Sequence, residues 1–278
     1  MVTNLTRIDA HAVVPDQLLS YVSAVSGLES RMVGECILHR GSDHAVLIAY
    51  PAQDSLNTAK MEESLELALK LPGLKHITVL SPHKLASAPD SAITHEDSYW
   101  MLPLPFEKTG GKLKNMLKRA RRDLHIEQAM GPDAWKTAHS EMAQDFCARK
   151  SLDDGTKYLF ARLGDYLAAS PEAVLFSAFN KADSLNALAI ADFGSLDTCF
   201  YMFACRKRDA IPGAADLLLS AIIAEAEKRG HARVNLGLGI EKGVEFFKRK
   251  WGAQKWLPLV ESSWDIPKKG WLARLLGR

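Results

Sequence analysis

The sequence lacks the features that define several large classes of protein. It contains no run of about 18 apolar residues, which a membrane-spanning helix requires. Its first 16 residues lack the basic and then apolar pattern of a secretion signal. Its few cysteines form no Cys-x-x-Cys pair and lie in or beside apolar runs: Cys36, Cys147, Cys199 and Cys205. We therefore expect reduced thiols and a cytoplasmic location.

Motifs that hold common metals and nucleotides are absent as well. The nine histidines show no His-x-x-x-His or His-Glu-x-x-His spacing, so we expect no metal ion. There is no Gly-x-Gly-x-x-Gly, Gly-x-x-x-x-Gly-Lys-Ser/Thr or Gly-x-Ser-x-Gly segment. These absences argue against a dinucleotide-dependent oxidoreductase, a P-loop nucleotide hydrolase and the usual serine hydrolase.

What is present is the composition of an ordinary globular protein. The chain has 278 residues, of which 47% are hydrophobic and 24% charged, with a formal charge of +2. So much apolar surface can offset the entropy of ordering the chain, which excludes disorder as the main state. The length permits one large domain or two modest ones. Composition alone names no function.

Positive charge is concentrated in two segments of this nearly neutral chain. Residues 107–122 hold seven lysines and arginines against one acid, and residues 248–278 hold eight against two. The remainder of the chain is therefore acidic. Two such patches suggest an anionic partner such as phosphate, nucleic acid or lipid headgroups. The competing interpretation is that both are solvated surfaces that keep the protein soluble.

Hydrophobic periodicity and turn residues predict alternating strands and helices in the first half. The expected elements are a helical lead-in at 15–25, a strand hairpin at 35–40 and 45–50, a helix at 57–71, strands at 76–80 and 99–104, and helices at 111–124, 133–150 and 156–169. The helix at 111–124 is amphipathic, with one apolar stripe and basic residues over most of its remaining surface.

The second half repeats the order strand, strand, helix, strand. We expect strands at 173–180, 184–193 and 198–205, a long helix, a strand at 234–236, a helix at 241–250 and a strand at 256–260. Pro212 marks the start of the long helix, and Gly230 marks its end. The fold class is therefore mixed α/β (α+β). The two halves echo one another in element order but show no residue-level repeat.

The segment 187–237 resembles the core of the GNAT (acyl-CoA N-acyltransferase) superfamily, in which two antiparallel strands lead through a basic loop into a long helix and a further strand. The run from Pro212-Gly213-Ala214 to Phe247-Lys248-x-x-Trp251-Gly252 is similar to the Fem-type branch, which includes the catalytic domain of lysyl-phosphatidylglycerol synthases. The basic helix at 112–124 also looks like the helix between the two halves of those proteins. The resemblance covers about 111–266.

The resemblance implies two tandem GNAT-like halves, each a mixed, largely antiparallel sheet flanked by helices. The expected segments are an N-terminal half at 1–106, connecting basic helices at 107–150, a C-terminal acyltransferase half at 151–266 and a basic amphipathic tail at 267–278. Before residue 111 the likeness rests only on the order of elements. An unrelated lid is the alternative for this part.

The function that the resemblance implies is transfer of an acyl group from a CoA-type thioester to an amine or hydroxyl, with acyl-CoA as the co-substrate. One alternative is an aminoacyl-tRNA-dependent transferase acting on a lipid or cell-wall precursor, whose basic helix would grip RNA phosphates through Arg119 and Arg122. Another is a non-catalytic protein that binds a phosphate-bearing ligand, because fold constrains chemistry loosely.

The start of the long helix is the expected donor site. A helix N-terminus offers free N–H groups and a partial positive charge, which suit a pyrophosphate. Five residues there are candidates: Arg206, Arg208, Gly213, Ala214 and Ala215. CoA-binding members place Arg or Gln three residues before the first glycine, where this chain has Ala210. A plain helix cap beside surface cations is the competing interpretation.

Catalytic candidates follow from what acyl transfer needs, namely a base for the acceptor and a donor for the leaving group. Asp192 ends the strand where the superfamily often has a base, although a turn-capping aspartate is common there. Tyr201 could protonate a leaving thiolate, and a core tyrosine is its alternative. Glu241 either caps its helix or acts as a base.

Two further residues and the tail are candidates for substrate contact. Asn235 lies at a strand end and would orient an acceptor, and Lys248 matches the family's Phe-Lys position and would face an anionic substrate. The tail 267–278 places Trp271 and Leu275 on one side of a short basic helix, which suits peripheral contact with an anionic membrane. A tail that folds back or frays is the alternative.

Overall fold

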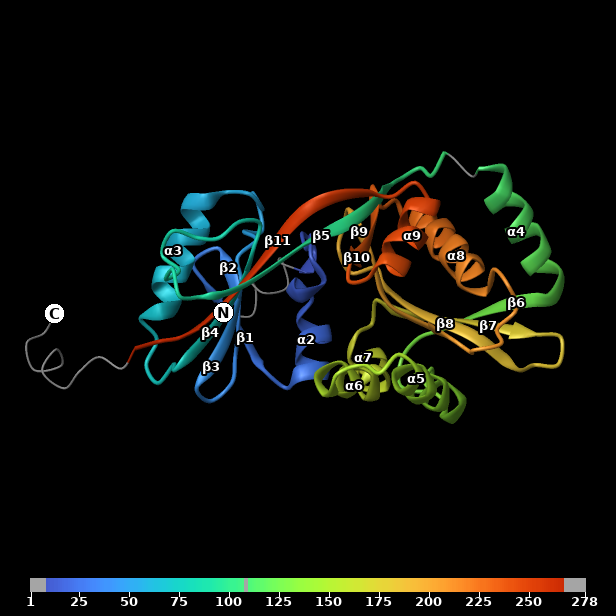
Figure 1. Ribbon diagram of the computed structural model, residues 1–278, viewed down its shortest axis with the longest axis horizontal. Coiled ribbons are helices and arrows are strands. Elements are labelled where there is room, and N and C mark those ends of the chain that lie inside the picture. Colours follow the sequence, from blue (N-terminus) through green and yellow to red (C-terminus); the bar gives the residue numbers. More distant parts are fainter. Residues whose placement is uncertain (1–8, 108–109, 268–278) are drawn as a thin grey trace, which may run out of the picture. The chain divides into compact units, whose positions relative to one another are not determined.

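The computed structural model describes residues 9–107 and 110–267, and the chain divides into two compact units. The larger unit combines the chain up to Gly27 with Ser98–Leu257, and the smaller unit combines Leu28–Asp97 with the chain from Pro258 onward. Two long strands, β5 (Ile93–Pro103) and β11 (Gln254–Asp265), run from one unit into the other (Figure 1).

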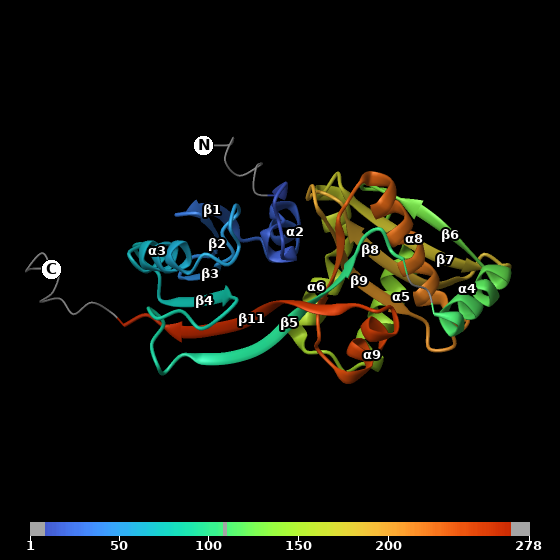
Figure 2. The ribbon, with the colours of Figure 1, turned by 90° about the horizontal axis from the view of Figure 1, so that it is seen from above.

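The smaller unit is a sheet with one covering helix. Its strand order is β1-β2-β3-β4-β11, and only the β3/β4 pair is parallel. The new strands are β1 (Glu29–Val33), β2 (Cys36–Arg40), β3 (His44–Ile48) and β4 (His76–Ser81). Helix α3 (Thr58–Leu69) begins after Asn57, whose side chain accepts a hydrogen bond from Lys60 N. Its apolar face completes a core with Leu47, Ile77 and Trp264. Helix α3 lies beside β1 and β2 (Figure 2).

The larger unit contains a sheet with the order β5-β10-β9-β8-β7-β6. Only β9 and β10 are parallel; the other neighbours are antiparallel. The new strands are β6 (Leu124–Ala129), β7 (Ala173–Asn180), β8 (Leu185–Asp192), β9 (Thr198–Arg206) and β10 (Arg233–Leu238). Every residue of β8 is buried, as expected of a central strand covered on both faces.

Helices cover both faces of this sheet (Figure 1). One face carries α4 (Gly111–Asp123), α8 (Ala214–Arg229) and α9 (Lys242–Lys250). The other carries α5 (Thr137–Arg149), α6 (Asp154–Ala161), α7 (Leu163–Ala169) and α2 (Leu19–Ser26), which follows the short 3-10 helix η1 (Pro15–Gln17). Helix α8 lies between two glycines in the left-handed region, Gly213 and Gly230, as its sequence predicts. None of the described helices is long and apolar enough to cross a membrane.

The structure confirms the mixed α/β class and most predicted elements, and corrects several details. The sequence does not predict β1 or β6. Both are edge strands with weak apolar alternation, and three of the six residues of β6 are polar and exposed. The helix expected at 133–150 begins only at Thr137, and the helix expected at 156–169 is two helices that meet at Arg162.

The compact units differ from the segments expected from the sequence. Helix α2 packs in the larger unit, where Tyr21 meets Tyr166 of α7 edge to face, and the end of β11 completes the sheet of the smaller unit. Compactness does not test whether 1–106 and 151–266 are two GNAT-like halves, so the tandem arrangement stays a prediction. The tail expected at 267–278 lies, apart from Pro267, outside the described residues.

Two buried histidines couple the stability of the larger unit to pH. His139 accepts a hydrogen bond from Lys136 N at 2.9 Å through Nδ1, so that nitrogen carries no proton. Neither ring nitrogen of His231 has a partner among the described residues. Burial lowers the pKa of both imidazoles below the usual 6.5, and the nearby Lys136 and Arg229 charges lower it further.

We expect the free energy of unfolding to fall as the pH drops below about 6.5, because the unfolded histidines then take up protons that the folded ones resist. Asp9 acts in the opposite direction, since burial raises its pKa to about 6 and folding then favours its protonated form. Urea titrations of His231→Leu at about pH 5.5 and 7.5 isolate one histidine. The free energy of unfolding should differ less between the two pH values in His231→Leu than in the wild type. The exposed control His125→Gln should keep the wild-type difference. An unchanged difference in His231→Leu would contradict the role given to His231.

Candidate functional site

Strands β9 and β10 separate soon after they meet. They pair in parallel at three positions only, ending with Phe200 opposite Asn235. Strand β9 then continues to Arg206 without a partner on that side, while β10 carries a bulge before Leu238. Gly237, with φ +75°, lies in this irregular stretch. We call this separation, between residues 201–206 and 236–238, the β9/β10 divergence. The ladder between the two strands ends there, which gives β9 an edge that an extended ligand can pair with.

A pocket of about 380 Å³ lies where β9 leads into α8. The lining comes from the end of β9, the loop and first turn of α8, and the last turns of α9: Arg206, Ala210, Ile211, Pro212, Gly213, Ala214, Ala215, Asp216, Phe247 and Lys250. Four of the five predicted donor-site residues are therefore together. Arg208 is exposed and is not in the lining.

Backbone amides at the start of α8 are available to a ligand. Ala214 N donates to Ile211 O at 3.1 Å, and Leu217 N begins the helical pattern by donating to Gly213 O at 2.8 Å. The amides between them, of Ala215 and Asp216, have no acceptor among the described residues. Together with the helix dipole they make this end attractive to an anion.

Gly213 is required here for two structural reasons. Its φ is +89°, which favours glycine. A Cβ atom at this position would lie 3.1 Å from Met116 Cγ and 3.2 Å from Ala120 Cβ of helix α4. The glycine thus permits α4 to pack over the start of α8, in addition to any approach of a phosphate.

A carboxylate that the sequence interpretation missed lies in the same pocket. Asp216 is 5% exposed, accepts a hydrogen bond from Trp251 Nε1 at 2.9 Å, and pairs with Lys250 Nζ at 2.5 Å. Asp216 is the third residue of α8, where a carboxylate commonly complements the helix dipole and attracts no special attention. Its partners lie about 35 positions away, so no local pattern marks it. Its charge offsets that of Lys250, so Arg206 is the lining cation with no carboxylate partner among the described residues.

Tyr201 lies at the start of the divergence, on the face covered by α8. Its ring packs against that core, and its hydroxyl has no hydrogen-bond partner among the described residues. Burial raises the pKa of the Tyr201 phenol, and the Asp216 carboxylate raises it further. The hydroxyl therefore stays protonated at neutral pH and can donate a proton. Its role in transfer remains a prediction.

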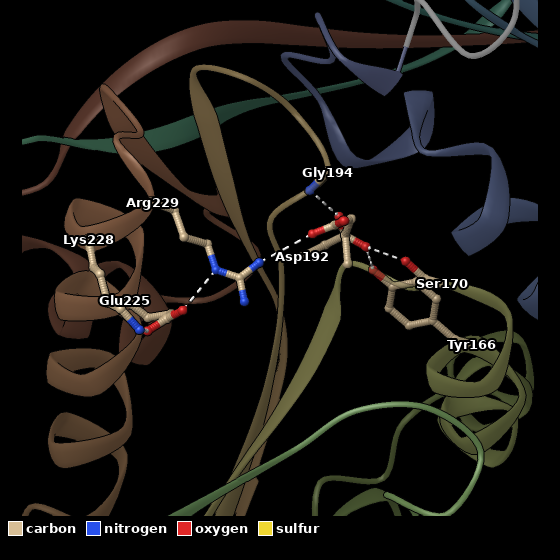
Figure 3. Close-up of polar contacts among 8 residues, drawn as sticks. Tyr166, Ser170, Asp192, Gly194, Glu225, Lys228 and Arg229 are labelled. Carbon is tan, nitrogen blue, oxygen red and sulfur yellow. Dashed lines mark hydrogen bonds and ion pairs between the residues drawn. The ribbon is translucent and has the colours of Figure 1, made fainter.

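Asp192 is not in the lining of the pocket, and its side chain lies beside Tyr166, Ser170 and Gly194 instead (Figure 3). It is buried, and three donors point at its carboxylate: Tyr166 Oη at 2.6 Å, Ser170 Oγ at 3.1 Å and Gly194 N at 2.9 Å. Arg206, which lines the pocket, pairs with Ala187 of β8. Asp192 lies five residues further along β8, which is about 17 Å at the rise of a strand. These contacts make Asp192 an anchor between β8 and α7, and its role as a base stays a prediction.

Asn235 and Lys248 hold backbone instead of facing the pocket. Asn235 donates to Val13 O at 2.9 Å and accepts from Gly237 N at 2.8 Å, so its amide is engaged at both ends. The buried Lys248 ammonium donates to Gly237 O at 2.8 Å and to Leu238 O. Both side chains therefore fix the bulged end of β10 and shape the divergence.

Glu241, the N-cap of α9, is exposed and pairs with Lys150 Nζ at 2.7 Å. Arg119 and Arg122 are exposed on α4 and outside the pocket lining. None of the predicted catalytic and substrate residues is in the pocket lining, although the lining residue Asp216 is near enough to Tyr201 to raise its pKa. In the described part of the chain no group of three His, Cys, Asp or Glu side chains is arranged to hold a metal ion.

Comparison with known proteins identifies solved structures that share this fold. No family model matches the sequence, and no curated protein matches it. The C-terminal domain (DUF2156) of a putative lysylphosphatidylglycerol synthetase from Agrobacterium fabrum is similar in structure, with a TM-score of 0.63, 13% identity and coverage of 99% of this chain and 95% of that one. FemX gives 0.66 at 11% identity, covering 100% and 98%. A GCN5-related N-acetyltransferase from Kribbella flavida gives 0.53 at 11%, covering 95% and 96%. At these identities the likeness shows the fold alone: this chain has the GNAT-like fold that FemX and the lysylphosphatidylglycerol synthetase domain share.

Proposed function

We propose that this protein is an acyltransferase that takes an acyl group from a phosphate-bearing donor of the acyl-CoA kind and moves it to an amine or hydroxyl. The observation that carries the proposal is the position of the α8 pocket at the end of β9, beside the β9/β10 divergence. The pocket supports binding of the donor's phosphates by Arg206 and the amides of Ala215 and Asp216. The unpaired edge of β9 supports binding of an extended arm that leads to the acyl group.

Transfer requires one bond to form and one to break at the acyl carbon. The acceptor nitrogen or oxygen attacks this carbon and bonds to it, the bond to the leaving sulfur breaks, and the proton that the acceptor loses passes to solvent water. The leaving thiolate takes a proton, and the Tyr201 hydroxyl is the candidate donor because it is protonated and has no hydrogen-bond partner among the described residues. No described carboxylate lies in position as a base, because Asp192 is remote and Asp216 is engaged by Lys250 and Trp251.

An aminoacyl-tRNA donor is the second candidate, and the surface of α4 favours it. Met116 and Ala120 place this helix against the start of α8. Six of its exposed cations have no acidic partner among the described residues: Lys112, Lys114, Lys118, Arg119, Arg121 and Arg122. Such a row suits a long phosphate backbone better than a single nucleotide.

Calorimetric titration with CoA, acetyl-CoA and a mixed tRNA pool separates these donors. We expect CoA and acetyl-CoA to bind with micromolar to millimolar dissociation constants, as is usual for co-substrates. Replacing Lys118 and Arg122 by alanine should leave CoA binding unchanged. If tRNA alone binds, if the double variant weakens it, and if its affinity falls steeply with salt, the donor is RNA. Binding of neither class would overturn the transferase proposal.

A further inference from the structure

The face of the smaller unit's sheet opposite α3 carries four polar side chains in one block of the β4/β11 ladder. His76 is directly opposite Asp265, and Thr78 is directly opposite Ser263. Because side chains alternate along a strand, all four point to the same face. The intervening Ile77 and Trp264 point to the other face, where both are buried in the core. The ladder therefore fixes the four positions.

The distances within this block are those of a nucleophile, a base and an orienting acid. His76 Nε2 lies 2.8 Å from Ser263 Oγ, and His76 Nδ1 lies 2.8 Å from Asp265 Oδ1. Thr78 Oγ1 lies 3.1 Å from Ser263 Oγ. All four residues belong to the smaller unit, separate from the pocket at α8.

Chemistry decides which group donates in each contact. The Asp265 carboxylate can only accept, so His76 Nδ1 carries the proton of the neutral ring. Nε2 is then an acceptor, and Ser263 donates its hydroxyl proton to it. Since that proton is used, Thr78 must be the donor to Ser263 Oγ. This is the proton arrangement in which a serine hydroxyl is ready to be deprotonated.

The block is open to molecules in solution. The side chain of His76 is 43% exposed and that of Asp265 is 92% exposed, while Ser263 and Thr78 are half-buried. The serine lies on a regular strand and not in the strand-to-helix turn that the Gly-x-Ser-x-Gly motif provides. A sequence motif could not reveal it, because its partner histidine is 187 residues away.

We propose that Ser263 is a nucleophile that small activated esters acylate, with His76 as its base. Ser263 Oγ bonds to the ester carbonyl carbon while its proton passes to His76 Nε2. The bond from that carbon to the alkoxy oxygen then breaks, and the leaving group takes the proton from His76. Asp265 holds the required tautomer, and the Thr78 hydroxyl can turn from Ser263 to the developing oxyanion. Water hydrolyses the acyl-serine in a second step.

This activity is additional to the proposed acyl transfer and does not depend on it. The test is reaction of the full-length protein with p-nitrophenyl acetate, followed by release of p-nitrophenol and by mass spectrometry of the peptide that contains Ser263. We expect a burst close to one equivalent and an acetyl group on Ser263. Ser263→Ala should abolish both, and His76→Gln should slow acylation by roughly 100-fold, the lower end of what a general base contributes. Asp265→Asn should slow it too, because an amide favours the other tautomer.

The matched control is His125→Gln. His125 is an exposed histidine within 3.7 Å of Glu127 and 4.0 Å of Asp183, and it has no serine partner among the described residues. This variant should acylate at the wild-type rate. Absence of a burst from the wild-type protein, acetylation of histidine or lysine only, or an unaltered burst in Ser263→Ala would each overturn the proposal. Peptide mapping of the wild type keeps the test valid even where a variant folds poorly.

Discussion

Asp192→Asn should lower the free energy of unfolding by about 3 kcal/mol. The buried carboxylate accepts from Tyr166, Ser170 and Gly194, so all three donors point at oxygen atoms (Figure 3). An amide replaces one oxygen by an NH2 group, which faces donors and cannot accept from them. Urea denaturation followed by circular dichroism measures the loss.

Two further measurements distinguish an anchor from a catalytic base. Tyr166→Phe removes one donor and leaves the carboxylate with the other two, so it should cost about 1–2 kcal/mol. Binding of CoA to folded Asp192→Asn should match the wild type, because the α8 pocket is remote along β8. A variant of normal stability that binds the donor but has lost transfer would restore Asp192 as the base.

The elements of the fold that sequence predicts well are those with strong local signals. Helix α8 ends at Gly230 as predicted, and it begins at Ala214, two residues after Pro212, where the sequence predicts its start. The amphipathic pattern of 111–124 likewise gives α4 within one residue. Edge strands β1 and β6 escape prediction because polar residues occupy positions that a central strand would fill with apolar ones.

The candidate site was predictable only in its local part. The loop before α8 carries its own signal, so Arg206, Gly213, Ala214 and Ala215 are identified correctly as neighbours of a pocket. Asp216 and Lys250 meet because α9 returns to the start of α8, and no local pattern encodes that return. The contacts of isolated polar residues escape prediction for the same reason. The partners that engage Asp192 and Asn235 lie 22 to 222 residues away, apart from nearby glycine amides.

Opposite effects on CoA binding are expected from two changes in the α8 pocket. Arg206→Ala removes the lining cation that has no carboxylate partner, and loss of a charge-assisted hydrogen bond of about 1.5–3 kcal/mol should weaken binding by roughly 10- to 100-fold. Asp216→Asn should instead strengthen binding by about tenfold, because Lys250 then meets the phosphate without a competing carboxylate. Isothermal titration calorimetry measures both.

The design of these variants separates charge from structure. In Asp216→Asn the amide oxygen can still accept from Trp251 Nε1, so the buried indole keeps its partner and the fold should persist. Arg208→Ala is the matched control, since Arg208 carries the same charge two residues from Arg206 but is not in the lining; its affinity should change by less than about twofold. If Asp216→Asn binds CoA more weakly at unchanged stability, the carboxylate contacts the ligand directly. A carboxylate would do so if it bound a cationic group of the ligand. If Arg206→Ala and Arg208→Ala lose equal affinity for CoA, a diffuse positive field attracts the donor. Only a defined phosphate-binding site distinguishes two arginines so close in sequence.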